Sequence, residues 1–237
     1  MSLPSNVHVS KHPCLLAKLS QLRSKSTSAK ETKSLIHEIA FIVGCEALAS
    51  AVEVSPGPKD ETPLGFEYTT SVISPQTISL VPILRSGLGM VEALQTDHQH
   101  QPAIQTLLPD PVPVHHLGLY REPSTLEPVE YYNNLPNHVS SSGGEGSPSS
   151  LAVILDPVIA TGGTCAAAIQ TLREWGAQRV LVLAITAALP GVTRAAEEWP
   201  EGVEIWVAGV DGELTDRGML KPGLGDVGDR LFLTIGK

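Results

Sequence analysis

The feature that most constrains the fold is a series of five short apolar runs, each closed by glycine or proline. None of these runs alternates apolar and polar residues, which is typical of strands buried on both faces of a parallel sheet. Stretches of helical character follow them, so the pattern predicts an α/β fold: an open, mostly parallel sheet flanked by helices, with right-handed crossovers. The predicted strands are 78–84, 112–120, 151–155, 180–187 and 203–210.

The first fifty residues have a different, helical character. Ser28 and Glu31 have the spacing of a capping box, and the apolar residues that follow recur at helical intervals. The pattern predicts a helix over 29–49 and a shorter amphipathic segment over 15–22.

A chain of 237 residues with 42% hydrophobic content is long enough to bury one substantial core. We therefore expect a single domain, 1–237, with a helical lead-in (1–50), an α/β core (77–210) and a C-terminal segment (211–237). Residues 97–113, rich in Gln, His and Pro, interrupt the strand pattern. Residues 140–150 contain only Ser, Gly, Glu and Pro, which predicts a mobile surface loop.

Charge and cysteine content exclude several classes of function. The formal net charge of −9 argues against a general attraction to nucleic acid or to an anionic membrane. The apolar runs are far shorter than the roughly 20 residues that span a bilayer, and residues 1–11 lack the apolar stretch of a secretory signal. Cys14, Cys45 and Cys165 are widely separated, so we expect reduced thiols in a cytoplasmic protein.

The strongest chemical signal is the segment 151–164. A buried strand ends at Asp156, a loop of small residues follows, and a helix is predicted from near Thr164 to Trp175, with Gly176 as its cap. Ligands of open α/β sheets bind outside the carboxyl ends of the strands, where this loop must lie. Gly162 and Gly163 allow backbone N–H groups to approach a phosphate, and the helix adds partial positive charge.

The other loop side chains suit a sugar phosphate. Thr161 and Thr164 offer hydroxyl donors, whereas Asp156 would repel a phosphate and would instead accept bonds from sugar hydroxyls or hold a hydrated magnesium ion. The loop matches neither the G-x-x-x-x-G-K-[ST] nor the G-x-G-x-x-G pattern. By itself, a Thr-Gly-Gly-Thr turn would also be compatible with an ordinary strand-to-helix connection.

The segment 155–164 resembles the phosphoribosyl pyrophosphate loop of the type I phosphoribosyltransferases. That loop usually has two adjacent acids, and the Asp156–Pro157 pair found here is typical of the uracil phosphoribosyltransferase branch. Segment 81–90 is similar to that branch's pyrophosphate loop, and 118–128 to its arginine-bearing segment. Segment 211–234 is similar to its uracil-binding hood, and the opening 9–13 also fits.

The resemblance implies transfer of the phosphoribosyl group from phosphoribosyl pyrophosphate to uracil, giving uridine monophosphate and pyrophosphate in pyrimidine salvage. Magnesium would enter bound to phosphoribosyl pyrophosphate, with no metal ligand among the residues themselves. The expected partners are these small molecules and a second copy of the chain in a homodimer, with no nucleic acid and no membrane. Some relatives respond to a purine nucleotide, and no motif here decides whether GTP binds.

The resemblance also implies roles for individual residues. Arg85, Arg121 and Asp226 form the catalytic set, in which the arginines hold the leaving pyrophosphate and Asp226 assists removal of the uracil N1 proton. Fixed cations that stabilise the developing charge on a leaving group are a major source of catalysis in such reactions. Phosphoribosyl pyrophosphate would contact Arg85, Arg121, Asp156, Pro157, Val158, Ile159, Ala160, Thr161, Gly162, Gly163, Thr164 and Asp226. Uracil would contact Leu220, Gly225, Asp226 and Val227.

Two departures from the branch's pattern concern base selectivity. Met219 replaces an aromatic residue, usually tyrosine, and Val227 stands where alanine is common. One or two methyl groups change discrimination between substrates by only about 1 to 3 kcal/mol, so these changes bear on selectivity and not on activity.

Other features are interpreted as structural. His98, His100, His115 and His116 lack acids at ligand spacing and are expected on the surface. Cys165 is expected to fill a tight turn, and Arg194 with Glu197, Glu198 and Glu201 to form a solvated helix face. Two rival functions are a regulatory protein that binds nucleic acid, which would need a basic stripe, and transfer to a purine, which would normally need paired acids in the loop.

Overall fold

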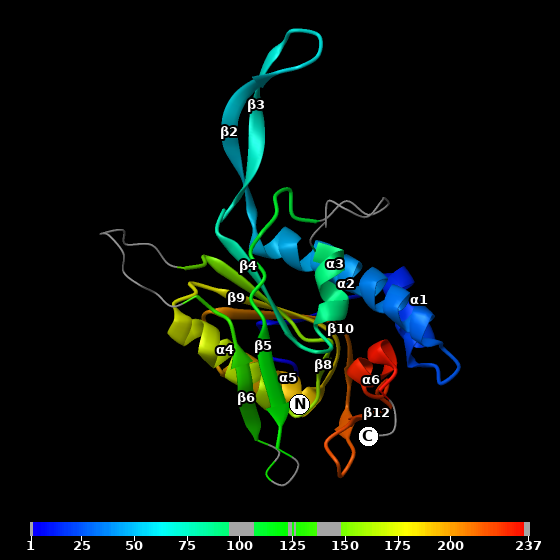
Figure 1. Cartoon of the computed structure of the whole chain (residues 1–237). Helices are drawn as coiled ribbons and strands as arrows, with labels where there is room; N and C mark the ends of the chain where they lie inside the picture. Colours follow the sequence, from blue (N-terminus) through cyan, green and yellow to red (C-terminus); the bar gives the residue numbers. More distant parts are fainter. Residues whose placement is uncertain (1, 95–106, 123–124, 126, 137–147, 235–237) are drawn as a thin grey trace.

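The computed structural model describes residues 2–94, 107–122, 125, 127–136 and 148–234, with the backbone alone at 92–94 and 121 (Figure 1). Most of segment 97–113, and all of the predicted mobile loop 140–150 except residues 148–150, lie outside the described residues.

The centre of the molecule is an eight-stranded sheet, counted over the described residues. Every strand pair in it is parallel except β5–β6, which is antiparallel, and the predicted open, mostly parallel α/β architecture is confirmed. In spatial order the strands are β1 (Val7–Val9), β10 (Val203–Asp211), β9 (Val180–Ala188), β7 (Leu151–Leu155), β4 (Ile78–Leu84), β5 (Leu117–Arg121) and β6 (Pro128–Asn133), and β8 (Val158–Ile159) pairs with β9 beyond the end of β7.

Helices cover both faces of the sheet, which explains why its strands carry unbroken apolar runs (Figure 1). Leu151, Val153 and Leu155 of β7 pack into one core with α1 (Pro13–Arg23), α2 (Ala29–Ala51) and α3 (Leu88–Leu94). Ala152 and Ile154 point the other way, into a second core with α4 (Gly163–Trp175) and α5 (Leu189–Glu197). Because successive side chains of a strand point to opposite faces of the sheet, one apolar run contributes side chains to both cores.

The longest helix, α2, begins at the predicted capping box. The Ser28 hydroxyl accepts a hydrogen bond from the Glu31 backbone N–H, and the Glu31 carboxylate accepts one from the Ser28 N–H. By length and composition α2 could cross a membrane, and it is the one helix of the described segments that passes this test. Here Ile36 and Ile39 of its apolar stripe are fully buried against the sheet and neighbouring helices, and Phe41 and Ile42 pack partly buried against the same core.

The element boundaries differ from the sequence prediction in several places. The strand predicted over 112–120 is wrong in extent, because β5 begins only at Leu117 and Val114 makes an isolated bridge to Leu80. Pro111 and Pro113 have no N–H to donate to a ladder, which explains the delayed start. Helix α2 runs two residues past the predicted end, and α4 begins at Gly163, one residue before the predicted start.

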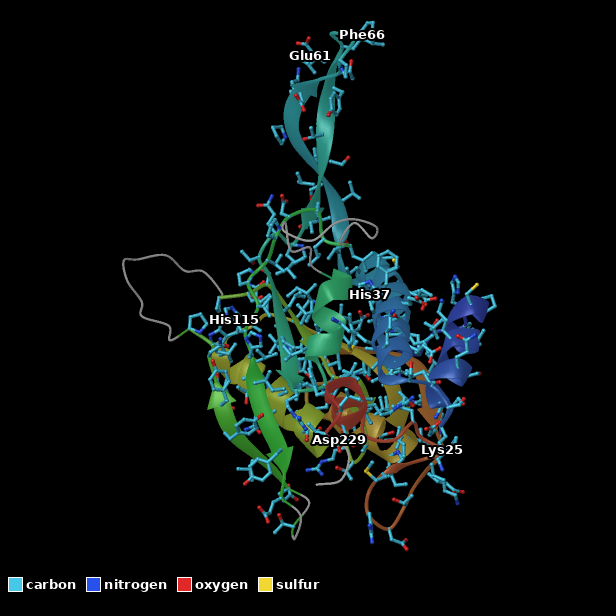
Figure 2. All side chains as sticks on the ribbon, turned by 45° about the vertical axis from the view of Figure 1, so that its right-hand side comes forward. Lys25, His37, Glu61, Phe66, His115 and Asp229 are labelled. Carbon is cyan, nitrogen blue, oxygen red and sulfur yellow. The ribbon has the colours of Figure 1, made fainter. Side chains whose placement is uncertain are left out.

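The sequence prediction missed a long β-hairpin, formed by β2 (Glu53–Glu61) and β3 (Glu67–Ser74). This hairpin projects away from the rest of the molecule, with Phe66 near its tip (Figures 1 and 2). Its residues are mostly exposed and its first strand contains two prolines. The sequence of this segment therefore lacks the regular alternation of apolar and polar residues that would predict a strand.

The C-terminal segment forms a small hood from β11 (Glu213–Leu214), β12 (Leu220–Lys221) and α6 (Val227–Phe232). Arg23, at the end of α1, fixes its position. The Arg23 guanidinium donates to both carboxylate oxygens of buried Asp211, over 2.6 and 3.0 Å, and to the Gly223 carbonyl over 2.7 Å. Arg230 donates in turn to the Leu22 and Leu224 carbonyls, over 2.7 and 2.8 Å. Two arginines therefore tie the hood to the end of α1.

We expect Asp211→Asn to destabilise the protein by about 3 kcal/mol, because removing one partner of a largely buried ion pair leaves the other charge uncompensated. Urea denaturation followed by circular dichroism would measure this. The matched control is Glu213→Gln, which removes a carboxylate from an exposed hood ion pair with Lys221 and should leave the midpoint unchanged. Equal midpoints for Asp211→Asn and the wild type would contradict the anchoring role.

Candidate active site

Three predicted site residues stand at the carboxyl ends of neighbouring parallel strands. Asp156 follows β7, Arg85 follows β4, and Arg121 ends β5, and these strands are adjacent in the order β7–β4–β5. Because parallel strands end at the same edge of a sheet, the three positions lie along one edge. The topology thus brings together residues that are far apart in sequence, although only the backbone of Arg121 is described.

The turn that carries Arg85 packs directly on the end of β7. A Cβ atom placed on Gly87 would lie 2.3 Å from the Leu155 carbonyl oxygen and 2.7 Å from the Ile83 nitrogen, so only glycine fits. The Gly87 N–H also donates to the Ile83 carbonyl over 2.9 Å. This close approach fixes the Arg85 turn next to Asp156.

The loop 156–164 is held against the start of α5. Gly162 adopts a left-handed conformation, with φ +80°, and a Cβ there would lie 2.2 Å from the Gly191 carbonyl oxygen. A Cβ on Gly191 would in turn lie 2.0 Å from the Ala160 carbonyl oxygen. The two backbones therefore touch, which keeps the loop in one conformation.

The first turn of α4 is suited to binding an anion. Its N-cap is Gly162, which has no side chain to accept hydrogen bonds from the first-turn N–H groups. These donors and the partial positive charge of a 13-residue helix remain for a ligand. Thr161 precedes the N-cap of this turn, and Thr164 lies within the turn.

Asp156 lies in a dry environment. Its side chain is buried, and burial raises the pKa of this carboxyl to about 7, although a hydrogen bond from the Val158 backbone opposes the shift. When it is ionised, a carboxyl group of this kind can accept a hydrogen bond from a hydroxyl group. Neighbouring Cys165 is also buried, and burial, reinforced by the charge of Asp156, raises the pKa of its thiol. The predicted packing role of Cys165 agrees with this environment.

Arg85 lies against Asp229 of α6 in the hood; Figure 2 labels Asp229. Its Nη2 atom is 3.5 Å from the Asp229 Oδ1, and its Nη1 donates to the Thr234 hydroxyl over 3.4 Å. Asp226 caps α6 by accepting a hydrogen bond from the Asp229 N–H over 2.9 Å. Since Arg85 is half exposed, this ion pair is weak and can give way to a substrate anion.

The predicted uracil residues lie together in the hood, but they present different groups. The side chains of Leu220 and Val227 are buried, with 8% and 3% exposure, whereas Gly225 and Asp226 are exposed. Gly225 has φ +79°, which turns the chain sharply just before α6. A base at this position would therefore meet backbone groups and the Asp226 carboxylate more than the Leu220 or Val227 side chains.

Arg194 has a contact that the sequence did not predict. Its Nη1 atom would lie 3.3 Å from a Cβ on Gly163, the first residue of α4, and its Nη2 is 3.7 Å from the Glu127 carboxylate. This arginine is exposed, in agreement with the predicted solvated face, but it also lies beside the loop 156–164, which the sequence did not predict. The only sequence signal was its position three residues after Gly191, which places both on one face of α5.

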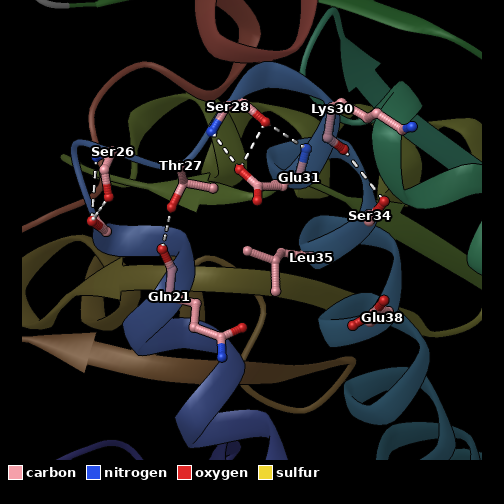
Figure 3. A pocket seen from close by; sticks show the side chains of 10 residues that line it. Gln21, Ser26, Thr27, Ser28, Lys30, Glu31, Ser34, Leu35 and Glu38 are labelled. Atoms are coloured by element: carbon pink, nitrogen blue, oxygen red, sulfur yellow. Dashed lines mark hydrogen bonds between the residues drawn. The ribbon is translucent and has the colours of Figure 1, made fainter.

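Two hollows in the described surface lie near the connection between α1 and α2. One, of about 790 Å³, is lined by hydroxyl-rich residues that bond to one another, such as Ser28 with Glu31, and by none of the predicted site residues (Figure 3). The other, of about 400 Å³, lies between this connection and the hood, and includes Gly225. Among the residues described, no cluster of three or more His, Cys, Asp or Glu is suited to a metal ion.

The environment of Asp156 predicts a pH-dependent stability. With a folded pKa near 7 against 3.8 when exposed, the native state binds the proton more tightly, so stability falls as pH rises through this window. Asp156→Asn removes the effect. The stability of this variant relative to wild type should rise by about 3 kcal/mol between pH 5 and pH 8, at 1.36 kcal/mol per pKa unit. If the melting temperatures of the two proteins changed with pH in parallel, the raised pKa would be excluded.

Comparison with known proteins gives a consistent result. A family model described as uracil phosphoribosyltransferase matches residues 9–234. Proteins named uracil phosphoribosyltransferase from Bacillus thuringiensis (strain Al Hakam) and Bacillus mycoides (strain KBAB4) are each 39% identical over 232 residues, covering 96% of this chain and 98% of theirs.

Solved structures agree with the sequence comparison. The AQ2163 protein from Aquifex aeolicus is 32% identical, with a TM-score of 0.79 and coverage of 95% of this chain and 97% of that one. An adenine phosphoribosyl transferase from Trypanosoma brucei, 17% identical with a TM-score of 0.50 over 95% of this chain and 92% of that one, shares the fold. The resemblance stated from the motifs is thereby confirmed, and the chain belongs to the uracil phosphoribosyltransferase family.

Proposed function

We propose that this protein transfers the phosphoribosyl group of phosphoribosyl pyrophosphate to uracil, forming uridine monophosphate and pyrophosphate in pyrimidine salvage. The observation that carries the proposal is the convergence of the glycine-containing loop 156–164, Arg85 and Asp156 at one sheet edge, with the C-terminal hood packed beside Arg85. Membership in the family supplies the substrates.

Each part of the site has a separate task in this reaction. The 5-phosphate would bind the N–H groups and hydroxyls of 160–164, and the Asp156 carboxylate would accept hydrogen bonds from the ribose hydroxyls. Pyrophosphate leaves with growing negative charge, and Arg85 and Arg121 would stabilise that charge. Arg85 would exchange its weak contact with Asp229 for the diphosphate.

Uracil would bind against the hood at 225–227 and lose its N1 proton. Asp226 is exposed and uses one carboxylate oxygen to cap α6, which leaves the second oxygen to accept that proton directly or through water. The buried side chain of Val227 takes part in the core, so its extra volume relative to alanine acts on the packing behind the base.

Magnesium would come with the diphosphate. Asp156 is the single acid of the loop 156–164, where Pro157 takes the place of a second one, and Mg²⁺ commonly retains waters and binds through substrate phosphates with one or two carboxylates. A single buried carboxyl fits a metal held mainly by the substrate. The ion would neutralise diphosphate charge there, and the residues named above would orient the ribose around it.

We also propose a cytoplasmic homodimer. The β2–β3 hairpin projects from the body with exposed apolar side chains, including Val54 at 77%, Leu64 at 82% and Phe66 at 68% exposure (Figure 2). A two-stranded hairpin is marginally stable by itself, and apolar groups at its tip favour burial against a partner. A second copy of the chain would supply that surface.

The activity is tested by measuring uridine monophosphate formation from phosphoribosyl pyrophosphate, Mg²⁺ and uracil, alongside adenine, hypoxanthine and orotate. Wild type should use uracil, and Arg85→Gln should lower kcat by about 100-fold, because a fixed charge on the leaving group is lost. The control Arg173→Gln, at the far end of α4, should retain full activity. Turnover of a purine base but not uracil would overturn the assignment.

The oligomeric state is tested by light scattering at micromolar concentrations. Wild type should have the mass of two chains, and Phe66→Asp should shift the population to monomer, since burial of a charge at an apolar contact is unfavourable. Lys59→Gln, on the same hairpin, is the surface control and should remain dimeric. A monomeric wild type, or a Phe66→Asp dimer of undiminished stability, would refute the hairpin contact.

A further inference from the structure

The position of Arg194 gives the phosphate loop a cation that the motif itself lacks. Arg194 stands near the end of α5, and its guanidinium reaches the first turn of α4: its Nη1 and Cζ atoms would be 3.3 and 3.6 Å from a Cβ on Gly163. That turn is capped by a glycine and offers N–H donors to an anion. A fixed positive charge and a helix N-terminus therefore occupy the same small region.

The packing of α5 fixes this arrangement. Gly191, one helical turn before Arg194, contacts the loop backbone so closely that a Cβ on it would meet the Ala160 carbonyl oxygen at 2.0 Å. Residues three apart share one face of a helix, so the contact that orders the loop also orients Arg194 toward it. Any shift of the Arg194 backbone relative to the loop would have to break this contact.

The present ion pair of Arg194 is suited to exchange. Its Nη2 lies 3.7 Å from the Glu127 carboxylate, and the two side chains are 48% and 64% exposed. Pairs of this length and exposure contribute little stability. A phosphate dianion held by the α4 N-terminus would offer a stronger, charge-assisted partner at nearly the same place.

We infer that Arg194 is a further substrate-binding residue, which contacts the 5-phosphate of phosphoribosyl pyrophosphate and of the nucleotide product. This inference rests on the proposed function, because it assumes that the loop 160–164 holds that phosphate. Glu127 occupies the guanidinium when the phosphate is absent. The residue acts on affinity for the phosphorylated sugar and not on the leaving group, which lies with Arg85 on the neighbouring strand end.

A different role for Arg194 would be to fasten the β5–β6 hairpin through Glu127. The two roles predict opposite behaviour for Glu127→Gln. If Arg194 acts through Glu127, this variant should weaken substrate binding as much as Arg194→Gln does. If Arg194 binds phosphate, removing the competing carboxylate should leave affinity unchanged or raise it.

The experiment is calorimetric titration of the full-length protein with ribose 5-phosphate, combined with steady-state kinetics. Arg194→Gln should raise the Kd of ribose 5-phosphate and the KM of phosphoribosyl pyrophosphate by about fivefold, equivalent to about 1 kcal/mol, with kcat changed by less than twofold. Arg194→Lys should recover part of the affinity. Arg173→Gln, at the other end of α4 where its guanidinium lies over Trp199, is the matched control and should bind like wild type.

A Kd for Arg194→Gln within twofold of wild type would overturn the inference, as would an equal loss in Glu127→Gln. The proposed function is judged separately by whether wild type forms uridine monophosphate. If the protein binds ribose 5-phosphate through Arg194 but transfers nothing to uracil, the Arg194 contact stands and the proposed transferase activity is refuted. Circular dichroism shows whether each variant is folded. If Arg194→Gln is unfolded, Arg194→Lys is compared with wild type in its place.

Discussion

The site depends above all on close contact between backbones at the carboxyl edge of the sheet. Gly87 packs on the end of β7, and Gly162 and Gly191 bring the loop 156–164 against α5 at distances that exclude any Cβ atom. These contacts hold in fixed relation the loop, the Arg85 turn and the helix carrying Arg194. Because the backbone itself is the packing surface, the N–H groups that would meet a phosphate are preorganised and need little reordering when a ligand binds.

The hood depends on a different interaction, the paired hydrogen bonds between Arg23 and buried Asp211. Asp211 ends β10, so this carboxylate marks where the core sheet passes into the hood, and Arg23 joins it to α1. On its opposite side the hood contacts Arg85 through Asp229 and Thr234. A short C-terminal segment with little core of its own is thereby held in part by charged and polar contacts from two elements, which suits the base-binding role proposed for it.

Much of the architecture could be predicted because the governing interactions are local or periodic. The strands at 78–84 and 151–155 matched their predictions, since buried parallel strands require continuous apolar runs. The capping box at Ser28 and the left-handed Gly176 were readable for the same reason, as each depends on a few adjacent residues. The β2–β3 hairpin was missed because most of its residues are exposed and it has no buried face to impose a pattern.

By itself, the sequence determined the fold class, the loop from Asp156 to Thr164 and the likeness to the family, since these follow from residue order over short spans. Only the tertiary structure decided which distant groups meet. The raised pKa of Asp156 arises from burial by separate elements, and the contact of Arg85 with α6 joins residues more than 140 positions apart. Arg194 is the clearest case, because its side chain would be only a solvated charge on an isolated helix and becomes a neighbour of the loop 156–164 when α5 packs at Gly191.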